Sequence, residues 1–249
     1  MDIKDKVAVV TGGAAGFGLR LVEQLTEGGA HVAALDIDES ALGALAGRFP
    51  AVTTISCDIT DPQAVESAVA EVAARAAHID ILINNAGIMK SAPLINLLAK
   101  DDRRHSVDLW RKVMDVNLNA VFYLTANVAD HMLRGRIKGV VVNISSISAR
   151  GNAGQSAYAA SKAGVEALTK VWAKELGRFG IRCGAVAPGF SETKSTADAL
   201  EKELLDRWVS QVPLRRLGTA DEVCDAVLFI IRNDFFNGGV IALDGGLVV

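Results

Sequence analysis

The chain has 249 residues, of which half are hydrophobic and only 5% aromatic, so we expect an aliphatic core in one large domain or two small ones. The formal net charge of −3 gives no electrostatic reason to expect nucleic acid or an anionic membrane as a partner. No hydrophobic run reaches the roughly 18 residues that cross a bilayer, and the run near the amino terminus is too short for a signal peptide. Three scattered cysteines, Cys57, Cys183 and Cys224, lack metal-ligand spacing and suit a reducing compartment. We therefore predict a cytoplasmic protein without a metal site.

Short β-branched segments alternate with longer amphipathic segments along the whole chain. The amphipathic segments, such as 62–77 and 156–178, place Ala, Leu and Val at helical spacing. These repeated strand–helix units predict an α/β fold, a doubly wound parallel sheet with helices on both faces. No linker-like tract divides the chain, so we expect a single domain over residues 1–249. The predicted strands are residues 6–11, 31–36, 52–57, 80–84, 139–144, 181–187 and 240–243.

The first predicted strand runs directly into a glycine-rich segment, TGGAAGFG at residues 11–18, which a helical pattern follows. Glycines at Gly12, Gly16 and Gly18 allow a sharp turn and a close approach of the backbone to a ligand. The free N–H groups at the start of the next helix would then face a pyrophosphate. A glycine cluster can also form a tight turn without any ligand, so its context decides.

Asp36, at the end of the second predicted strand, supplies that context. It follows Gly18 by 18 residues, near the spacing at which an acidic side chain receives the ribose hydroxyls of a dinucleotide. A carboxylate there accepts from the 2′-OH of NAD and repels the 2′-phosphate of NADP, and the glycine loop carries no Arg or Lys. We predict NAD as cofactor, with a solvated turn acid as the alternative. Asp58, after the third strand, is predicted to meet the adenine or to cap the helix that begins near Pro62.

Two irregular stretches interrupt the alternation of strands and helices. Residues 88–108 follow the fourth predicted strand, and residues 188–212 follow the sixth. Both begin at the carboxyl edge of the sheet, where open α/β sheets bind their ligands. We expect them to form the walls of a substrate pocket.

Tyr158 and Lys162 are four residues apart in a predicted helix, which puts them one turn apart on the same face. An unperturbed tyrosine titrates near pH ~10, too high for a base at neutral pH. The Lys162 cation should lower the pKa of Tyr158, so that the phenol can exchange a proton with an alcohol. A partly buried tyrosine beside a surface lysine is the alternative.

Polar side chains accompany this pair. The fifth predicted strand ends in Ser145 and Ser146, and either hydroxyl could hold a substrate oxygen near Tyr158. Asn117 lies in a long helical stretch, where an unpaired buried amide would be costly. A water relay, a helix kink and a satisfied structural amide remain open for it.

Taken together, these motifs resemble the short-chain dehydrogenase/reductase family, in order and over essentially the whole chain. The family would imply a seven-stranded Rossmann fold without a metal and an Asn117–Ser146–Tyr158–Lys162 tetrad. It would also imply a homotetramer or a dimer through the helices that carry Asn117 and Tyr158. The carriers of the resemblance are residues 11–18, Asp36, Asn84-Asn85-Ala86-Gly87, Asn117, Ser145 and Ser146, Tyr158 and Lys162, residues 188–193, and Asp244-Gly245-Gly246.

The resemblance further implies which residues contact the two ligands. The implied substrate contacts are Ser146, Ser148, Gln155, Tyr158 and Phe190. The implied cofactor contacts are Gly12, Ala15, Gly16, Phe17, Gly18, Asp36, Ile37, Asp58, Ile59, Asn85, Ala86, Gly87, Tyr158, Lys162, Pro188, Gly189, Ser191 and Thr193.

The chain departs from the family pattern in three places. In many relatives the catalytic serine lies 13 positions before the tyrosine, which here is Ser145, whereas the strand-end pattern matches Ser146. We choose Ser146 and keep Ser145 in reserve, because loops lose residues more easily than a strand end shifts register. The segment between Gly87 and Asn117 is longer than in the shortest relatives, and Ser191 replaces an aliphatic residue.

The sequence predicts an NAD(H)-dependent oxidoreductase that interconverts a secondary alcohol and a ketone. Residues 152–162 and 212–218 most resemble 3-oxoacyl thioester reductases, although steroid and polyol dehydrogenases share these patterns. Arg150 could meet an acidic group, whereas Arg103 and Arg104 more simply face solvent. A non-catalytic NAD-binding sensor or structural protein is the alternative. A sugar-nucleotide epimerase would need a larger carboxyl-terminal domain than the remaining chain provides.

Overall fold

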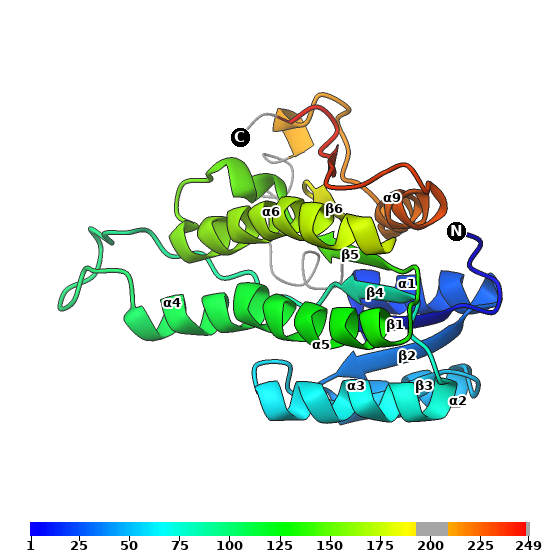
Figure 1. Ribbon diagram of the computed structural model, residues 1–249. Coiled ribbons are helices and arrows are strands. Elements are labelled where there is room, and N and C mark those ends of the chain that lie inside the picture. Colours follow the sequence, from blue (N-terminus) through cyan, green and yellow to red (C-terminus); the bar gives the residue numbers. More distant parts are fainter. Residues whose placement is uncertain (193–208, 248–249) are drawn as a thin grey trace.

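The computed structural model describes residues 1–192 and 209–247 and contains a seven-stranded sheet in the order β3-β2-β1-β4-β5-β6-β7 (Figure 1). Every neighbouring pair is parallel, which confirms the doubly wound α/β prediction. The order reverses between β1 and β4, and this is where such sheets bind ligands. The strands are β1 (Val7–Thr11), β2 (His31–Asp36), β3 (Thr53–Ser56), β4 (Ile81–Asn84), β5 (Val140–Ile144), β6 (Arg182–Pro188) and β7 (Val240–Leu243).

The central strands β1, β4, β5 and β6 are buried along their whole length. Helices α1 (Gly16–Glu27), α2 (Glu39–Arg48) and α9 (Ala220–Arg232) pack on one face of the sheet. Helices α3 (Pro62–Ala76), α5 (Ala120–Arg134) and α6 (Ser156–Leu176) pack on the other. The two aliphatic core clusters between these layers explain why the strands read as continuous hydrophobic runs.

Side chains set the starts of the helices. Asp61 caps α3 by accepting from the Gln63 N–H at 2.9 Å. Asp58, which the sequence allowed as this cap, instead accepts from the N–H and the hydroxyl of Thr60. The cap alternative for Asp58 was therefore wrong, because a side-chain cap must sit directly before the first helical turn.

The long helical stretch around Asn117 is present but not uniform. Helix α4 (Val107–Met114) passes through a π-helical turn (Asp115–Asn119) into α5. A π-helical turn shifts the side chains that follow relative to the helix axis, and such turns often occur at functional sites. Asn117 lies inside this turn and is completely buried.

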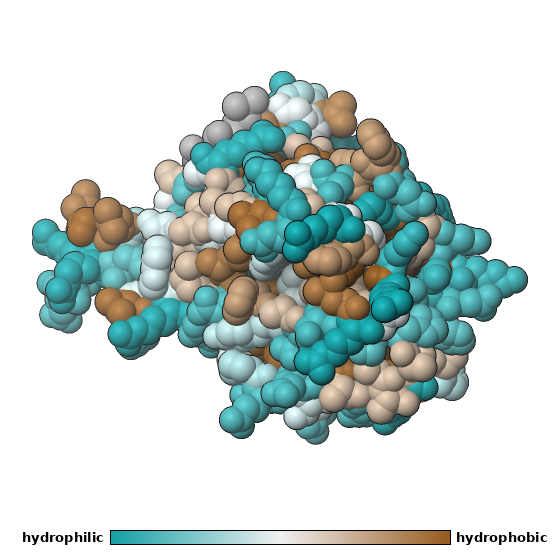
Figure 2. Space-filling model, viewed as in Figure 1, coloured by the Kyte–Doolittle hydropathy of each residue, from teal (hydrophilic) through white to brown (hydrophobic). Residues whose placement is uncertain are grey.

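Residues 88–106 form an irregular segment, the projecting arm, which extends beyond the start of α4 (Figure 1). Its two sides meet at an antiparallel bridge between Ile95 and Arg104. Leucines at its tip face solvent, with Leu98 exposed by 93%, and hydrophobic groups are visible there in Figure 2. Arg104 is held by Asp102 at 2.9 Å and is exposed, as is Arg103, so both face solvent as the simpler expectation had it.

Cys57, Cys183 and Cys224 are all buried free thiols. In residues 1–192 and 209–247, no helix combines the length and hydrophobicity that a membrane crossing requires. The same residues contain no cluster of metal-binding side chains.

Candidate active site

The glycine loop joins β1 to α1 and has the form of an anion cradle. Gly12 and Gly16 adopt left-handed backbone conformations, with φ of 62° and 54°. A side chain at Gly18 is excluded, because its Cβ would lie 1.9 Å from the Gly12 carbonyl oxygen. Ala15 precedes α1 in an extended conformation without capping it through a side chain, and no acidic residue lies in the first turn of the helix. The N–H groups at this helix start therefore remain available to a pyrophosphate.

Asp36 closes β2 beside this loop. Its carboxylate accepts from the Ala14 N–H and from the Asp38 N–H, both at 3.1 Å. Each carboxylate oxygen can accept a further hydrogen bond, so the group still fits a ribose diol. Ile37, next in sequence, is 67% exposed and offers a hydrophobic surface. The predicted adenine-side residues Asp58 and Ile59 follow the end of the neighbouring strand β3.

The segment after β4 connects the glycine loop to the rest of the site. The backbone N–H groups of Asn85 and Ala86 both donate to the Thr11 hydroxyl, at 3.1 and 3.0 Å. The Asn85 amide donates to the carbonyl oxygen of Thr11 at 2.9 Å. A Cβ on Gly87 would lie 3.2 Å from Asn117 Oδ1 and 3.5 Å from Lys162 Nζ. A side chain at Gly87 would therefore press against Asn117 and Lys162.

The three predicted catalytic side chains of β5 and α6 converge at the carboxyl edge of the sheet. Lys162 is buried and donates from Nζ to the Ile144 carbonyl oxygen at 2.8 Å. Its ammonium lies 5.8 Å from the centre of the Tyr158 ring. The Ser146 hydroxyl hydrogen-bonds to Tyr158 and accepts from the Ser148 N–H at 3.2 Å. A substrate oxygen placed beside Tyr158 would therefore also be within reach of Ser146.

Ser145 points to a different place. Its hydroxyl lies 3.0 Å from Glu166 Oε1 and 3.3 Å from the Lys162 carbonyl oxygen, both on α6. Neighbouring residues of an extended strand point to opposite sides, so only one of the two serines can face Tyr158. This geometry favours Ser146 over Ser145.

Burial governs the acidities of the pair. The pKa of Lys162 is lowered to about 8, because its charged form loses hydration. Burial raises the pKa of Tyr158, and the hydrogen bond from Ser146 opposes that rise. The expected lowering of the Tyr158 pKa by Lys162 does not outweigh burial here.

Asn117 forms a satisfied pair with the start of the projecting arm. Its Oδ1 accepts from the Ile88 N–H at 2.8 Å, and its Nδ2 donates to the Ile88 carbonyl oxygen at 2.9 Å. A weaker contact of 3.4 Å reaches Ser161 on α6. These contacts fit the satisfied structural amide and the π-helical turn fits the helix kink, while the water relay and the place of Asn117 in the tetrad stay predictions.

Two further predicted substrate residues shape the rim. Gln155, directly before α6, donates from its amide to the Ser91 hydroxyl at 3.3 Å and pairs through its backbone with Ala92. Ser148 is buried in the turn after β5. Arg150 ends that turn, with Nη1 3.8 Å from Asp244 Oδ2. Gln155 thus binds the projecting arm to the helix of Tyr158.

Of the two segments expected to form the walls of the substrate pocket, the one after β6 contributes Phe190, Ser191 and Val212 to the lining of a pocket, whereas residues 88–108 contribute none. Pro188 ends β6, and the Gly189 N–H donates to the Leu243 carbonyl oxygen of β7 at 2.8 Å. Ser191 is buried and pairs through its backbone with Gly218. The predicted contact Thr193 lies outside the described residues.

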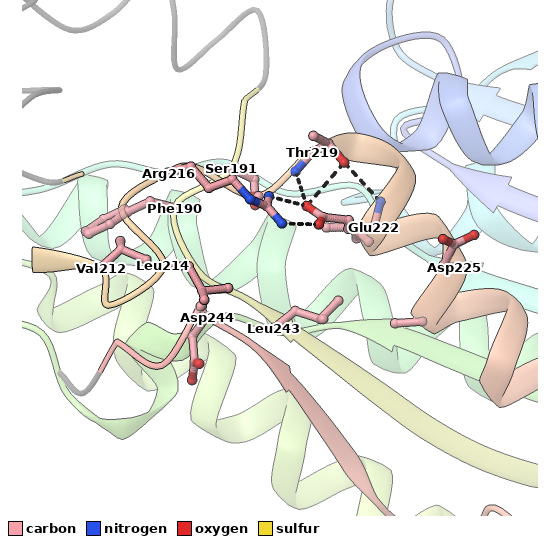
Figure 3. Close-up of a pocket in the computed structure, with 14 residues that line it drawn as sticks. Phe190, Ser191, Val212, Leu214, Arg216, Thr219, Glu222, Asp225, Leu243 and Asp244 are labelled. Atoms are coloured by element: carbon pink, nitrogen blue, oxygen red, sulfur yellow. Dashed lines mark hydrogen bonds and ion pairs between the residues drawn. The ribbon is translucent and has the colours of Figure 1, made fainter. Parts of the chain in front are cut away.

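A pocket of about 420 Å³ opens beside this wall, between residues 212–219, the start of α9 and the end of β7 (Figure 3). Phe190, Val212, Leu214 and Leu243 give it a hydrophobic side. At its edge Arg216 binds both carboxylate oxygens of Glu222, at 2.9 and 2.6 Å. Tyr158, Ser146 and Lys162 are not among its lining residues, so this pocket is separate from the Tyr158 hydroxyl.

The sequence reasoning missed the residues that support this wall. Thr219 and Glu222 form a capping box at the start of α9, with Glu222 Oε2 accepting from the Thr219 N–H at 2.8 Å. A threonine followed three residues later by a glutamate is a recognisable signal for a helix start. No sequence pattern of this kind indicates the contact between Ser145 and Glu166, which are 21 positions apart.

A doubly wound sheet with a glycine loop after its first strand and a tyrosine–lysine pair beside its fifth defines a class of nicotinamide-dependent oxidoreductases. A family model described as enoyl-(acyl carrier protein) reductase matches residues 12–248. The chain is 38% identical to a 3-oxoacyl-[acyl-carrier-protein] reductase of Thermotoga maritima, over all of both chains. It is 34% identical to a (3R)-3-hydroxyacyl-CoA dehydrogenase of Canis lupus familiaris, over 99% of this chain and 98% of the other.

The fold comparison agrees. The crystal structure of gox2181 matches with a TM-score of 0.89 and 34% identity, covering 98% of this chain and 95% of that one. The chain belongs to the short-chain dehydrogenase/reductase family, as its motifs predicted.

Proposed function

We propose that this protein transfers a hydride between NAD(H) and a secondary alcohol/ketone pair, with Tyr158 as the general acid and base. The observation that carries the proposal is the convergence of Tyr158, Lys162 and Ser146 at the carboxyl edge of the sheet, the edge at which the glycine loop also begins. Catalytic groups must lie within hydrogen-bonding reach of the atom they protonate. The Tyr158 and Ser146 hydroxyls, which bond each other, meet that requirement for one substrate oxygen.

Each residue has a distinct part in this reaction. A bound nicotinamide ring would supply or accept the hydride. In the reductive direction Tyr158 gives its proton to the carbonyl oxygen, and in the oxidative direction it takes the alcohol proton. Ser146 donates a hydrogen bond to the same oxygen and orients it. Lys162 places a positive charge beside the phenol and favours its ionised form.

The cofactor preference follows from Asp36. A carboxylate at this position accepts from both ribose hydroxyls of NAD and repels a 2′-phosphate. The residues that could hold the cofactor start with the α1 N–H groups and Asp36 and continue through Asn85, Ala86 and Gly87 to Lys162. The side chains of the glycine loop offer no cation that would counter the repulsion.

The substrate class follows from the relatives. Both curated relatives carry names for reactions at the third carbon of an acyl thioester. The hydrophobic side of the pocket beside Phe190 is suited to an aliphatic group. We therefore put a 3-oxoacyl or 3-hydroxyacyl thioester first among small-molecule substrates, ahead of steroids and polyols.

A homo-oligomer, a tetramer or a dimer, is the assembly we propose, in the cytoplasm. Large hydrophobic side chains are exposed on the helices α4, α5 and α6, which face the viewer in Figure 2. Patches of this kind on soluble proteins mark contact surfaces. These residues are Trp110, Phe122, Leu133 and Val171.

The test is an absorbance assay of the purified protein with NAD and NADP against secondary alcohols, and with NADH and NADPH against 3-oxoacyl thioesters and diketones. We expect turnover with NADH and a 3-oxoacyl thioester. Binding of NADH without turnover on any substrate would instead indicate a non-catalytic nicotinamide-binding protein. Preference for NADPH would contradict the role given to Asp36.

A further inference from the structure

One helix holds the end of one strand at three successive positions. Tyr158, Lys162 and Glu166 are spaced by four residues on α6, so they lie on one face in consecutive turns. Each contacts a different residue of the Ile144–Ser146 segment. Tyr158 meets Ser146, Lys162 donates to the Ile144 carbonyl oxygen, and Glu166 accepts from Ser145. The first two of these contacts belong to the proposed chemistry, and the third has no role in it.

The contact between Ser145 and Glu166 is suited to hold the other two contacts in place. Ser145 is 2% exposed, and its hydroxyl lies 3.0 Å from Glu166 Oε1. A hydrogen bond to a charged acceptor stabilises more than one between neutral groups. In the part of the chain that the structure describes, no ion pair competes for the Glu166 carboxylate.

The position of this contact determines what it can control. Ser145 lies between two residues that contact the proposed catalytic pair. The Ile144 carbonyl oxygen accepts from Lys162, and the Ser146 hydroxyl bonds Tyr158. The Ser145 N–H is also fixed, donating to the Val186 carbonyl oxygen of β6 at 2.7 Å. The hydrogen bond of the Ser145 side chain therefore constrains the distance between the Ile144–Ser146 backbone and α6. A shift of the backbone here would move the Ser146 hydroxyl away from Tyr158.

We propose that Glu166 is a positioning residue, which acts through the Ser145 hydroxyl to hold Ser146 at hydrogen-bonding distance from Tyr158. The inference rests on the proposed role of Tyr158 in turnover. Small misplacements of groups at a reaction centre can lower rates by orders of magnitude. Glu166 would thus affect the rate without touching substrate or cofactor.

The chain offers a readout of this contact that does not depend on activity. It contains only two tyrosines, Tyr123 and Tyr158. In a Tyr123→Phe background, the ultraviolet absorbance of the phenolate reports the ionisation of Tyr158 alone. The hydrogen bond from Ser146 lowers the pKa of Tyr158, so a weaker bond should raise it.

The experiment compares Ser145→Ala, Glu166→Ala and Glu166→Gln with Glu175→Ala, an exposed residue of the same helix. We expect kcat to fall roughly tenfold in Ser145→Ala and Glu166→Ala, while NADH affinity stays within about twofold of the parent. Tyr158 should titrate at higher pH in both. Glu166→Gln retains an acceptor and should keep most of the rate, and Glu175→Ala should leave every readout unchanged. The double variant should lose no more than either single variant, because both remove one contact.

Unchanged titration of Tyr158 in folded Ser145→Ala would overturn the proposal, as would additive losses in the double variant. Failure of the proposed function would look different. The parent protein would then lack turnover on every substrate, while the Tyr158 titration would still test whether Glu166 and Ser145 position Ser146.

Discussion

The two regions of the proposed active site, the glycine loop and the Tyr158–Lys162 region, are built from different parts of the polypeptide. At the cofactor end, glycines and backbone N–H groups form the surface, and Gly18 approaches the Gly12 carbonyl too closely for any side chain. At the other end, Tyr158 and Lys162 project from one helix onto the end of β5. The comparison indicates that the cofactor end depends on the path of its backbone, whereas the Tyr158 end depends on the functional groups of its side chains. Substitutions should therefore fail for different reasons at the two ends.

The largest effect is expected from Tyr158→Phe, which removes the proton donor and keeps the ring. General acid–base catalysis contributes 10²–10⁴-fold, so we expect kcat to fall by about 10³-fold. NADH binding, followed by its fluorescence, should be nearly unchanged because the glycine loop is untouched. Tyr123→Phe is the matched control and should keep the parental rate. A rate within tenfold of the parent would show that Tyr158 is not the general acid and base. The Tyr158 region would then not differ from the glycine loop in the way described above.

Gly18→Ala tests the opposite end. The new Cβ would lie 1.9 Å from a backbone oxygen, which forces the loop to move and should cost at least about 3 kcal/mol of stability. NADH affinity should fall together with the melting temperature. Gly47→Ala in α2 is the control, since its Cβ meets nothing within 4 Å, and it should stabilise by about 0.5–1 kcal/mol. Normal NADH binding by Gly18→Ala would show that the loop tolerates side chains and does not cradle the cofactor.

Asp36 is the exception at the cofactor end, because we propose that there a side chain selects the ligand. Asp36→Ala should reduce the preference for NAD over NADP by roughly 10- to 100-fold, the effect of losing a hydrogen bond to a charged group. Asp36→Asn keeps an acceptor for the Ala14 N–H and removes the charge, so its affinity for NADP should rise while the loop stays in place. Ratios of kcat/KM for the two cofactors measure both effects. Equal use of NAD and NADP by the unaltered protein would contradict this assignment.

The smallest effect concerns the pH dependence of stability at Lys162. Its pKa is about 8 in the folded protein and 10.5 in an ordinary lysine, so between these values the unfolded chain binds more protons. The free energy of unfolding should therefore rise with pH over this window, by about 1–3 kcal/mol in total. Denaturant unfolding at a series of pH values should show this rise in the parent and not in Lys162→Met. Parallel curves for the two proteins would mean that Lys162 titrates normally.

Most of the fold could be predicted from the sequence because its signals are local. Hydrophobic runs marked the strands to within one or two residues, and Asp36 and Tyr158 were found from their spacing to neighbouring motifs. The β7 strand matched its predicted bounds, 240–243. Local patterns also located the helix that carries Tyr158 and Lys162, which ends at Leu176 and continues in a short turn to Phe179.

Contacts between distant segments could not be predicted in this way. Both Ser145 and Ser146 contact α6, and spacing and composition do not determine which hydroxyl meets Tyr158 and which meets Glu166. The attachment of Gln155 to Ser91 joins residues 64 positions apart. The pocket beside Phe190 likewise depends on how residues 212–219 fold against α9 and β7. The effect of burial on Tyr158 could be judged only once its surroundings were known.

The way the projecting arm is attached has a consequence for how this enzyme scaffold can diversify. Asn117 fixes the arm at Ile88, Gln155 fixes it at Ala92, and the His105 ring contacts the Ala92 carbonyl at 3.2 Å where the arm returns. All three attachments involve Ile88 or Ala92, near the base of the arm, and none involves residues 94–104. We expect substitutions at the solvent-facing positions of residues 94–104 to leave the contacts of Asn117 and Gln155 with the arm in place. The tip of the arm can therefore vary in sequence while the segments that carry Asn117, Tyr158 and Lys162 stay the same.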